Sequence, residues 1–272
     1  MKKVILALLI VAMISVSCFS LMACNSGVAV GFQNATTGKD YVESFSNLTA
    51  KGYSSAGLAV QDMINGRIKY VVTDKAVAKE LVKAYSDKVK LIDINLTKEK
   101  YAFAVKNGND ELLAKVNEFL ANNSDEVQAI IEGYTNGTIT PKKFTNGDKN
   151  APNTLIVATN AEFDPFEYMD GGAFSGIDME IMAMFCEEYG YTMYVENMAF
   201  EAVVTSIQTD KADIAAAALT VTIARAEQVS FSDAYFLDDG EDASQVIIAP
   251  IADTTFDNCK TKEDVEAIIK NL

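Results

Sequence analysis

The chain has 272 residues, and 38 acidic side chains outnumber 23 basic ones, which gives a net charge of −15. Dispersed acids without basic clusters argue against binding to nucleic-acid phosphates. The sequence contains no histidine, which excludes a histidine-based catalytic triad and the commonest protein ligand of transition metals. We expect no cofactor and assign no residue to a metal site.

The first 23 residues have the features of a secretory signal. Lys2 and Lys3 precede an almost unbroken apolar run over residues 4–16, which is of signal-peptide length and too short to favour a spanning helix. Leu21-Met-Ala-Cys24 resembles the lipobox of bacterial lipoproteins, in which the cysteine is acylated and becomes the new N-terminus. We expect Cys24 to anchor an extracytoplasmic protein to the cell membrane. The alternative is an ordinary cleaved signal followed by an incidental cysteine.

Residues 28–133 alternate between strand and helix patterns, which predicts α/β architecture with mainly parallel sheets. A strand over 28–32 leads into a turn-rich stretch at 33–38. Helices follow from hydrophobic spacing at 3.6-residue period, and short apolar runs indicate strands. The expected helices cover 57–65, 75–85 and two segments between 112 and 131, and the expected strands cover 70–72, 91–94 and 101–105.

Residues 135–153 are polar and contain two prolines and two glycines, a composition that predicts a linker. After it we expect a strand at 155–158, helices at 177–189 and 200–208, and a strand at 213–217. The chain ends on a predicted helix over 261–272, where Thr261 and Asp264 have the spacing of a capping box. Its apolar stripe needs a sheet to cover, and the strand at 28–32 needs a preceding helix. Each end of the chain lacks what the other end supplies.

Several motifs of the second half resemble the opening part of bacterial amino-acid-binding proteins. They are Leu155-Ile-Val-Ala-Thr-Asn-Ala-Glu-Phe-Asp-Pro-Phe-Glu-Tyr168, Gly176-Ile-Asp-Met-Glu180, Thr220-Val-Thr-Ile-Ala-Arg225 and Phe231-Ser-Asp-Ala-Tyr235. Residues 28–133 resemble the closing part of the same proteins, yet they come first. The chain is thus similar to the polar amino-acid receptors of ABC importers, the type II periplasmic solute-binding proteins, with its halves exchanged by circular permutation. The alternative is a fusion of two unrelated gene fragments.

The resemblance implies a two-lobed fold, in which each lobe is a mainly parallel sheet flanked by helices and two strands form the hinge. One lobe would be discontinuous, made of residues 24–98 plus 244–272. The other would be continuous over 99–243 and would contain the permutation linker 135–153. The two crossings between the lobes would fall near residues 98–101 and 236–244, and the second carries the acidic stretch 237–243. We expect a solvated loop there. The alternative is a calcium site, although the spacing of the acids matches no known calcium-binding loop.

The resemblance also implies a site for a free amino acid between the lobes, where each ligand charge needs a fixed partner. Arg225, in a Thr-x-Thr-x-x-Arg motif with Thr220, matches the arginine that binds the carboxylate through its planar fork. The alternative is a surface arginine on a short helix. Asp74 matches the aspartate that binds the ammonium. It also has the sequence position of a helix N-cap, and the two roles are compatible.

Other positions match the family's ligand contacts less directly. The stretch 33–38 resembles the family's Gln-x-Gly-Thr-Thr-Gly, with Thr37 directed at the carboxylate and Gln33 nearer the ligand side chain. Ala35 replaces the usual glycine there. The remaining matches are two aromatic residues that would sandwich the ligand or belong to the core, one polar contact to the ligand side chain, and one alanine where glycine is common: Phe163, Phe200, Asn160 and Ala218.

These matches favour a monomeric, lipid-anchored receptor that delivers an amino acid to the membrane subunits of an ABC permease. Because Asn160 rather than an acid holds the side-chain position, we favour an uncharged polar amino acid, with Glu162 as the nearby acid that a cationic ligand would need. The alternatives are a non-transport sensor or diverged paralogue, and a dehydratase-like enzyme using Glu162 or Asp74. Cys186 and Cys259 fit ordinary small apolar residues, with a disulfide as the alternative.

Overall fold

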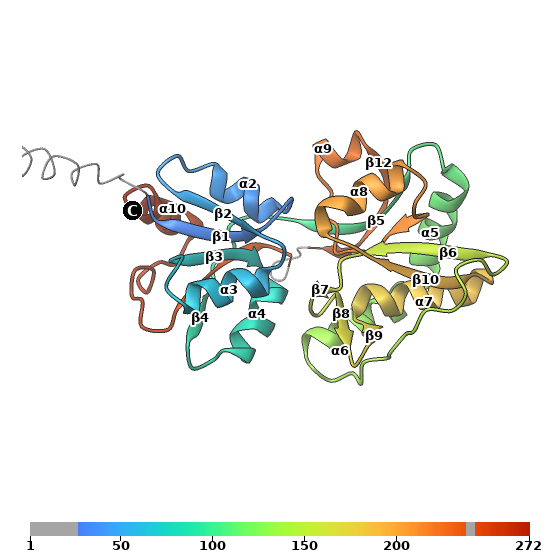
Figure 1. Ribbon diagram of the computed structural model, residues 1–272, viewed down its shortest axis with the longest axis horizontal. Coiled ribbons are helices and arrows are strands. Elements are labelled where there is room, and N and C mark those ends of the chain that lie inside the picture. The colour runs from blue at the N-terminus through green and yellow to red at the C-terminus, as the bar shows by residue number, and fades with distance from the viewer. Residues whose placement is uncertain (1–26, 238–242) are drawn as a thin grey trace, which may run out of the picture.

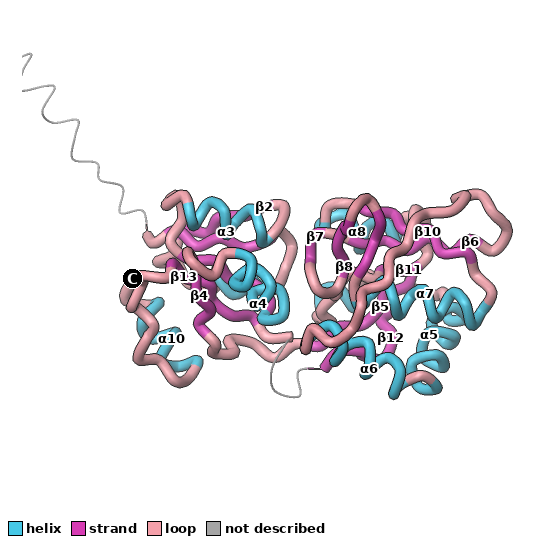
Figure 2. The backbone as a smooth tube through the Cα atoms, turned by 90° about the horizontal axis from the view of Figure 1, so that it is seen from below, coloured by secondary structure: helices cyan, strands magenta, loops and turns pink. Residues whose placement is uncertain are grey.

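The computed structural model describes residues 27–237 and 243–272, which form two lobes with a separate five-stranded sheet in each. Figure 1 shows the lobes side by side along the long axis of the molecule, and Figure 2 shows the same separation after a quarter turn. The two-lobed α/β fold expected from the sequence is confirmed. The signal segment, Cys24 and residues 238–242 of the acidic stretch lie outside the described residues.

The sheet of the first lobe contains strands from both ends of the chain. Its order is β2-β1-β3-β13-β4, with bounds Ala29–Gln33 (β1), Thr49–Tyr53 (β2), Tyr70–Asp74 (β3), Val89–Ile92 (β4) and Gln245–Pro250 (β13). β1 pairs in parallel with β2 and β3, whereas β13 runs antiparallel between β3 and β4. The C-terminal part of the chain therefore completes a sheet that the N-terminal part begins.

Helices cover both faces of this sheet: α2 (Thr37–Glu43), α3 (Ala56–Ile64), α4 (Lys75–Ala84) and α10 (Lys262–Ile269). The side chains of β3 alternate between the faces, as a strand buried on both sides requires. Tyr70 and Val72 pack in the core cluster that contains residues of α2 and α10, while Val71 packs in the cluster that contains residues of α3 and α4.

The sheet of the second lobe has the order β10-β6-β11-β5-β12, with bounds Lys100–Lys106 (β5), Thr154–Thr159 (β6), Thr192–Asn197 (β10), Ile214–Ala215 (β11) and Val229–Leu237 (β12). β6 pairs in parallel with β10 and β11, and β5 runs antiparallel to its two neighbours. The helices of this lobe are α5 (Asp110–Asn122), α6 (Ser124–Thr135), α7 (Ile177–Tyr189), α8 (Phe200–Gln208) and α9 (Ile223–Ala226). A small antiparallel sheet lies beside them, made of β7 (Glu162–Phe163), β8 (Glu167–Asp170) and β9 (Ala173–Ser175).

The segment that the sequence predicts as a linker is fastened to the second lobe. Phe144 pairs with Phe174 through two backbone hydrogen bonds of 2.8 Å. The side-chain amide of Asn146 donates to the Val195 carbonyl at 2.8 Å and accepts from the Val195 N–H at 2.7 Å. These hydrogen bonds hold residues 136–153, which form no helix, against the second lobe.

The two ends of the described chain pack together in the first lobe. Val265 and Ile269 of α10 are buried in the same core cluster as Val30 and Phe32 of β1, and the Asn47 side chain donates to the Ile269 carbonyl at 2.6 Å. The capping box predicted at the start of this helix is confirmed. Figure 1 shows α10 (dark red) against the strands that begin the chain (blue).

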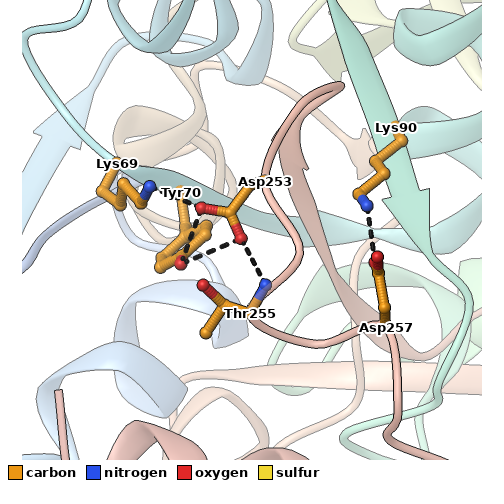
Figure 3. Close-up of polar contacts among 6 residues, drawn as sticks. All are labelled: Lys69, Tyr70, Lys90, Asp253, Thr255 and Asp257. Atoms are coloured by element: carbon orange, nitrogen blue, oxygen red, sulfur yellow. Dashed lines mark hydrogen bonds and ion pairs between the residues drawn. The ribbon is translucent and has the colours of Figure 1, made fainter.

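Polar contacts also hold the segment between β13 and α10 on this lobe (Figure 3). Asp253 accepts a hydrogen bond from the Thr255 N–H at 2.8 Å and forms an ion pair with Lys69. The Lys90 ammonium donates to the Asp257 carboxylate at 2.6 Å.

None of the helices in the described part of the chain has the length and hydropathy of a membrane-spanning segment.

Replacing Ile269 by alanine is expected to lower the free energy of unfolding by about 2–5 kcal/mol, because it removes methyl groups from a packed core. Ile269 is 3% exposed, whereas Leu272, three residues further on, is 36% exposed. Leu272→Ala is therefore the matched control, with an expected change below about 0.5 kcal/mol. Urea unfolding of both variants measures this, and equal effects would contradict the packing of the C-terminal helix on the N-terminal strand.

The structure differs from the predicted elements in several places. The strand expected at 91–94 lies at Val89–Ile92, because its pairing with β13 ends at Ile92. The stretch expected as a turn at 33–38 already contains the first residues of helix α2. The strands β12 and β13, which belong to the two main sheets, were not predicted. The strands β2 and β10 and the small sheet β7-β8-β9 were not predicted either. They are short and partly exposed, so they lack a clear apolar period.

Candidate ligand-binding site

A pocket lies between the two lobes. On the first lobe it is lined by the last residues of β1 and β3 and by the start of α2. Four lining residues belong to the first lobe and five to the second: Gln33, Thr36, Thr37, Asp74, Phe163, Phe200, Ala218, Thr220 and Arg225. Eight of the nine ligand-binding residues expected from the sequence are in this set. The ninth, Asn160, touches the pocket through Gln33, whose Nε2 donates to the Asn160 Oδ1 at 2.8 Å. The tertiary structure thus brings together residues from both halves of the chain.

Arg225 lies on the short helix α9, whose start is capped by the Thr222 side chain. Its guanidinium turns into the pocket and stacks over the Phe200 ring, with 5.4 Å between the guanidinium carbon and the ring centroid. Nη1 donates to the Thr220 carbonyl and Nη2 to the Ala35 carbonyl of the opposite lobe, each at 2.8 Å. Burial lowers the pKa of Arg225, while the nearby carboxylates of Glu99 and Asp74 act in the opposite direction. The arginine is a pocket residue, not a surface residue of α9.

Asp74 ends β3 and is 4% exposed. It has the N-cap position of α4, but its side chain makes no capping hydrogen bond. Instead its carboxyl accepts a hydrogen bond from the Tyr101 hydroxyl of the second lobe. Burial, and next the charge of Glu99, raise the pKa of Asp74 to about 7, although hydrogen bonds from Tyr101 and Gln245 oppose this shift. A cation placed beside Asp74 would relieve the cost of its buried charge.

Glu99 lies beside the pocket, although no sequence motif indicated a role for it. It belongs to the segment that crosses from β4 to β5 and is 7% exposed, while its neighbours Lys98 and Lys100 are exposed. Its carboxylate accepts hydrogen bonds from the hydroxyls of Thr37 and Thr220. In sequence, an acid between two lysines has the pattern of a solvated charged turn. The only signal was its place on a predicted crossing between lobes.

Two side-chain amides meet at the Gln33 end of the pocket. Gln33 and Asn160 come from opposite lobes, and the Asn160 Nδ2 also donates to the Met198 carbonyl at 2.9 Å. The Gln33 Oε1 is a buried acceptor without a hydrogen-bond partner among the described residues. A buried acceptor of this kind is stabilised when a donor reaches it, so this end of the pocket suits a ligand group that carries N–H or O–H.

Ala35 and Ala218 occupy positions at which the family that the sequence resembles has glycine. Both have a positive backbone φ, 60° for Ala35 and 43° for Ala218. This left-handed region favours glycine because a Cβ is crowded there. The Ala218 conformation is held from below: its N–H donates to the buried Asp178 Oδ2 at 3.0 Å, and Tyr235 donates to the other oxygen at 2.6 Å. Burial raises the pKa of Asp178 to about 7.

The backbone conformation predicts that Ala35→Gly stabilises the protein. Glycine adopts the left-handed conformation without strain, which adds about 1–2 kcal/mol to the free energy of unfolding. The greater freedom of glycine in the unfolded chain lowers that free energy by about 0.5–1 kcal/mol. The expected net gain is about 0.5–1 kcal/mol in urea unfolding. Ala267→Gly, at an exposed position inside α10, is the control and should cost about 1 kcal/mol. A loss of stability in Ala35→Gly would show that the φ of this residue is not a source of strain.

Side chains from both lobes fill most of the pocket. The remaining space measures about 10 Å³ for the centre of a water molecule, which is room for about one water. Phe163 and Phe200 contribute to this filling from the second lobe. A ligand the size of an amino acid therefore requires the lobes to move apart before it enters.

The other residues singled out from the sequence are placed as follows. Glu162 is exposed and lines a separate groove of about 330 Å³ between the lobes, together with Glu80 and Asp164. Cys186 and Cys259 are free thiols, so the disulfide alternative is wrong. Among the described residues, no group of three or more potential metal-ligating side chains comes together.

One family model matches part of the second half of the chain. Residues 155–249 match the model of the bacterial extracellular solute-binding proteins, family 3. The arginine-binding extracellular protein ArtP of Bacillus subtilis is 32% identical over 91 residues, which is 34% of this chain and 36% of that protein. A protein of Neisseria gonorrhoeae described as a probable histidine-binding protein is 30% identical over 95 residues, 35% of this chain and 34% of its own length.

Among solved structures, the arginine-bound form of a truncated arginine-binding protein from T. maritima is 30% identical, with a TM-score of 0.30 and coverage of 31% of this chain and 40% of that one. The chain spans about a third of the length of the curated relatives named above. Over residues 155–249, then, this two-lobed protein is similar in sequence to the family 3 extracellular solute-binding proteins of bacteria.

Proposed function

We propose that this protein is an extracytoplasmic receptor that binds a free amino acid between its two lobes for uptake by an ABC importer. The observation that carries the proposal is the pairing of Arg225 and Asp74, which come from opposite lobes and line one pocket. A planar guanidinium suits a carboxylate, and a buried carboxyl suits an ammonium. Together they provide one partner for each charge of a zwitterion, which otherwise loses its hydration on burial.

The other lining residues extend this assignment. Thr37 and Thr220 supply hydroxyl donors near the guanidinium, and Phe163 and Phe200 supply flat apolar walls for the aliphatic part of the ligand. Ala218 offers a backbone held by Asp178. The lobes move apart to admit the ligand and close again around it, and the membrane subunits of a permease recognise this liganded closed form.

We further propose that the ligand side chain is polar and uncharged. The amides of Gln33 and Asn160 and the unpartnered Gln33 Oε1 support a ligand group that both donates and accepts hydrogen bonds. A cationic amino acid is the second candidate. It is favoured by Glu99, a buried carboxylate beside the pocket, and by the similarity to proteins named for binding arginine and histidine.

The exchanged order of the two halves is part of the proposal. The packing of α10 on β1 and the insertion of β13 beside β3 support it, because the lobe needs elements from both ends of the chain. Chain ends that lie close together on the surface permit permutation at low energetic cost. The signal-like residues 1–23 and the lipobox at Cys24 support a lipid-anchored protein, and we propose that it acts as a monomer.

A binding role is favoured over catalysis. The two carboxyls considered as an acid or base are Asp74, which Tyr101 already engages, and Glu162, which lies in a different groove. They do not share one site, so they do not form a positioned pair for proton transfer. A sensor that uses the same closure without transport has the same pocket, and membrane partners would distinguish it.

Calorimetry against the twenty standard amino acids tests the proposal, on protein dialysed free of bound ligand. We expect at least one polar amino acid to bind with a Kd below about 1 mM, and glutamine and asparagine to bind more tightly than arginine and lysine. The reverse order would replace the uncharged ligand by a cationic one. Heats indistinguishable from dilution for all twenty would reject the amino-acid receptor.

A further inference from the structure

Glu99 connects three hydroxyl groups in the middle of the molecule. Its Oε1 accepts from the Thr97 hydroxyl at 2.8 Å, and its Oε2 accepts from the Thr37 hydroxyl at 2.9 Å and the Thr220 hydroxyl at 2.8 Å. Thr37 belongs to the first lobe and Thr220 to the second, while Glu99 lies on the crossing between them. One carboxylate oxygen therefore bridges the two lobes.

This bridge is stronger than a contact between neutral groups. Hydrogen bonds to an ionised acceptor are roughly twice as strong as those between neutral partners, and Glu99 is screened from water by its burial. Within the first lobe, the Gln245 Nε2 donates to the Thr37 hydroxyl oxygen at 3.1 Å, so the Thr37 hydrogen is free to point at Glu99. The contacts stabilise the arrangement in which Thr37 and Thr220 face each other.

The same bridge occupies donors that the ligand needs. A hydroxyl has a single hydrogen to donate, so Thr37 and Thr220 cannot donate to Glu99 and to a ligand carboxylate at the same time. A second carboxylate placed beside Glu99 is also repelled in this buried surrounding. The charge of Glu99 reaches across the pocket, since it contributes to the raised pKa of Asp74.

We propose that Glu99 is an internal competitor for the ligand's carboxylate: it holds the lobes together before the ligand binds and thereby sets the affinity of the site. The proposal rests on the function assigned above, because it takes Thr37 and Thr220 as partners of an amino-acid carboxylate. The ligand must displace Glu99 from both hydroxyls, and the side chain of Glu99 then turns toward solvent at the crossing.

The test is Glu99→Gln, which keeps the size of the side chain and removes its charge. Calorimetry with glutamine, and separately with arginine, compares the variant with the unchanged protein. Small-angle X-ray scattering compares their radii of gyration after dialysis and again with saturating glutamine. Glu126→Gln is the matched control, because it makes the same charge change at an exposed position of α6. Glu99→Asp, whose shorter side chain does not span both hydroxyls, serves if Glu99→Gln fails to fold.

We expect the variant to bind glutamine about tenfold more tightly, and its radius of gyration to exceed that of the unchanged protein until glutamine is added. A tenfold loss of affinity, for arginine above all, would overturn the proposal and make Glu99 a partner of a ligand cation. Unchanged affinity and radius would make Glu99 a structural residue only. If no amino acid binds the unchanged protein, the proposed function fails, and the scattering data still decide whether Glu99 holds the lobes together.

Discussion

Replacing Arg225 by alanine is expected to weaken amino-acid binding by at least about a hundredfold. The variant leaves the buried ligand carboxylate without its cation, and breaking a buried pair in this way typically costs about 3–5 kcal/mol. It also removes the hydrogen bond from Arg225 Nη2 to the Ala35 carbonyl, which joins the lobes. The affinity of Arg225→Lys should lie between those of Arg225→Ala and the unchanged protein, since lysine keeps the charge and loses the planar fork.

The matched control is Arg67→Ala, because Arg67 is the other arginine of the chain and is exposed on the first lobe. Arg67 forms an ion pair with Asp62, and neither residue lines the pocket. The Kd of Arg67→Ala for the amino acid should therefore stay within a factor of two of the unchanged protein. Calorimetry with the tightest-binding amino acid measures both variants, and urea unfolding confirms that each is folded. Equal affinities for Arg225→Ala and the unchanged protein would remove Arg225 from the site.

Amino-acid affinity is expected to decrease as pH falls below about 7, because Asp74 must be ionised to bind an ammonium. Burial and the charge of Glu99 raise the pKa of Asp74 from 3.8 to about 7, so the neutral acid predominates below that pH. The loss should approach tenfold per pH unit at lower pH. The raised pKa also means that Asp74 favours folding at low pH and loses this contribution as pH rises from about 4 to 7.

Asp74→Asn is the test variant, since its amide is neutral at every pH. Its affinity at pH 8 should be at least about thirtyfold lower, and its pH dependence between 5.5 and 8.5 should be flat. Calorimetry over this range, repeated in buffers of different ionisation enthalpy, also counts the proton released on binding. A pH profile that persists in Asp74→Asn would assign the titration to another group.

Much of the fold follows from local sequence signals. The helices α7 and α8 have the predicted bounds 177–189 and 200–208, because each has an apolar period and a clear end. The capping box of α10 depends on two side chains three residues apart. The short strands β2, β7 and β9 depend on partners distant in sequence or on a turn, so their local pattern carried little information.

The site divides in the same way. Motifs such as Thr-x-Thr-x-x-Arg and the stretch 33–38 are contiguous, so the residues that line the pocket were accessible from sequence. The hydrogen-bond partners of the buried carboxyls Asp74 and Glu99 were not accessible from sequence. Asp74 has the sequence position of a helix cap, and only the approach of Tyr101 gives its side chain a different partner.

The sequence by itself determined most of the helices, the strands with a clear apolar pattern and the residue types that line the pocket, since these depend on spacing along the chain. The tertiary structure alone decided that Glu99 is buried between Thr37 and Thr220 and that little space remains between the lobes. The physical reason is that burial and hydrogen-bond partners are set by segments far apart in the chain. An acid flanked by two lysines has the same local pattern whether its carboxylate meets water or two hydroxyls from opposite lobes.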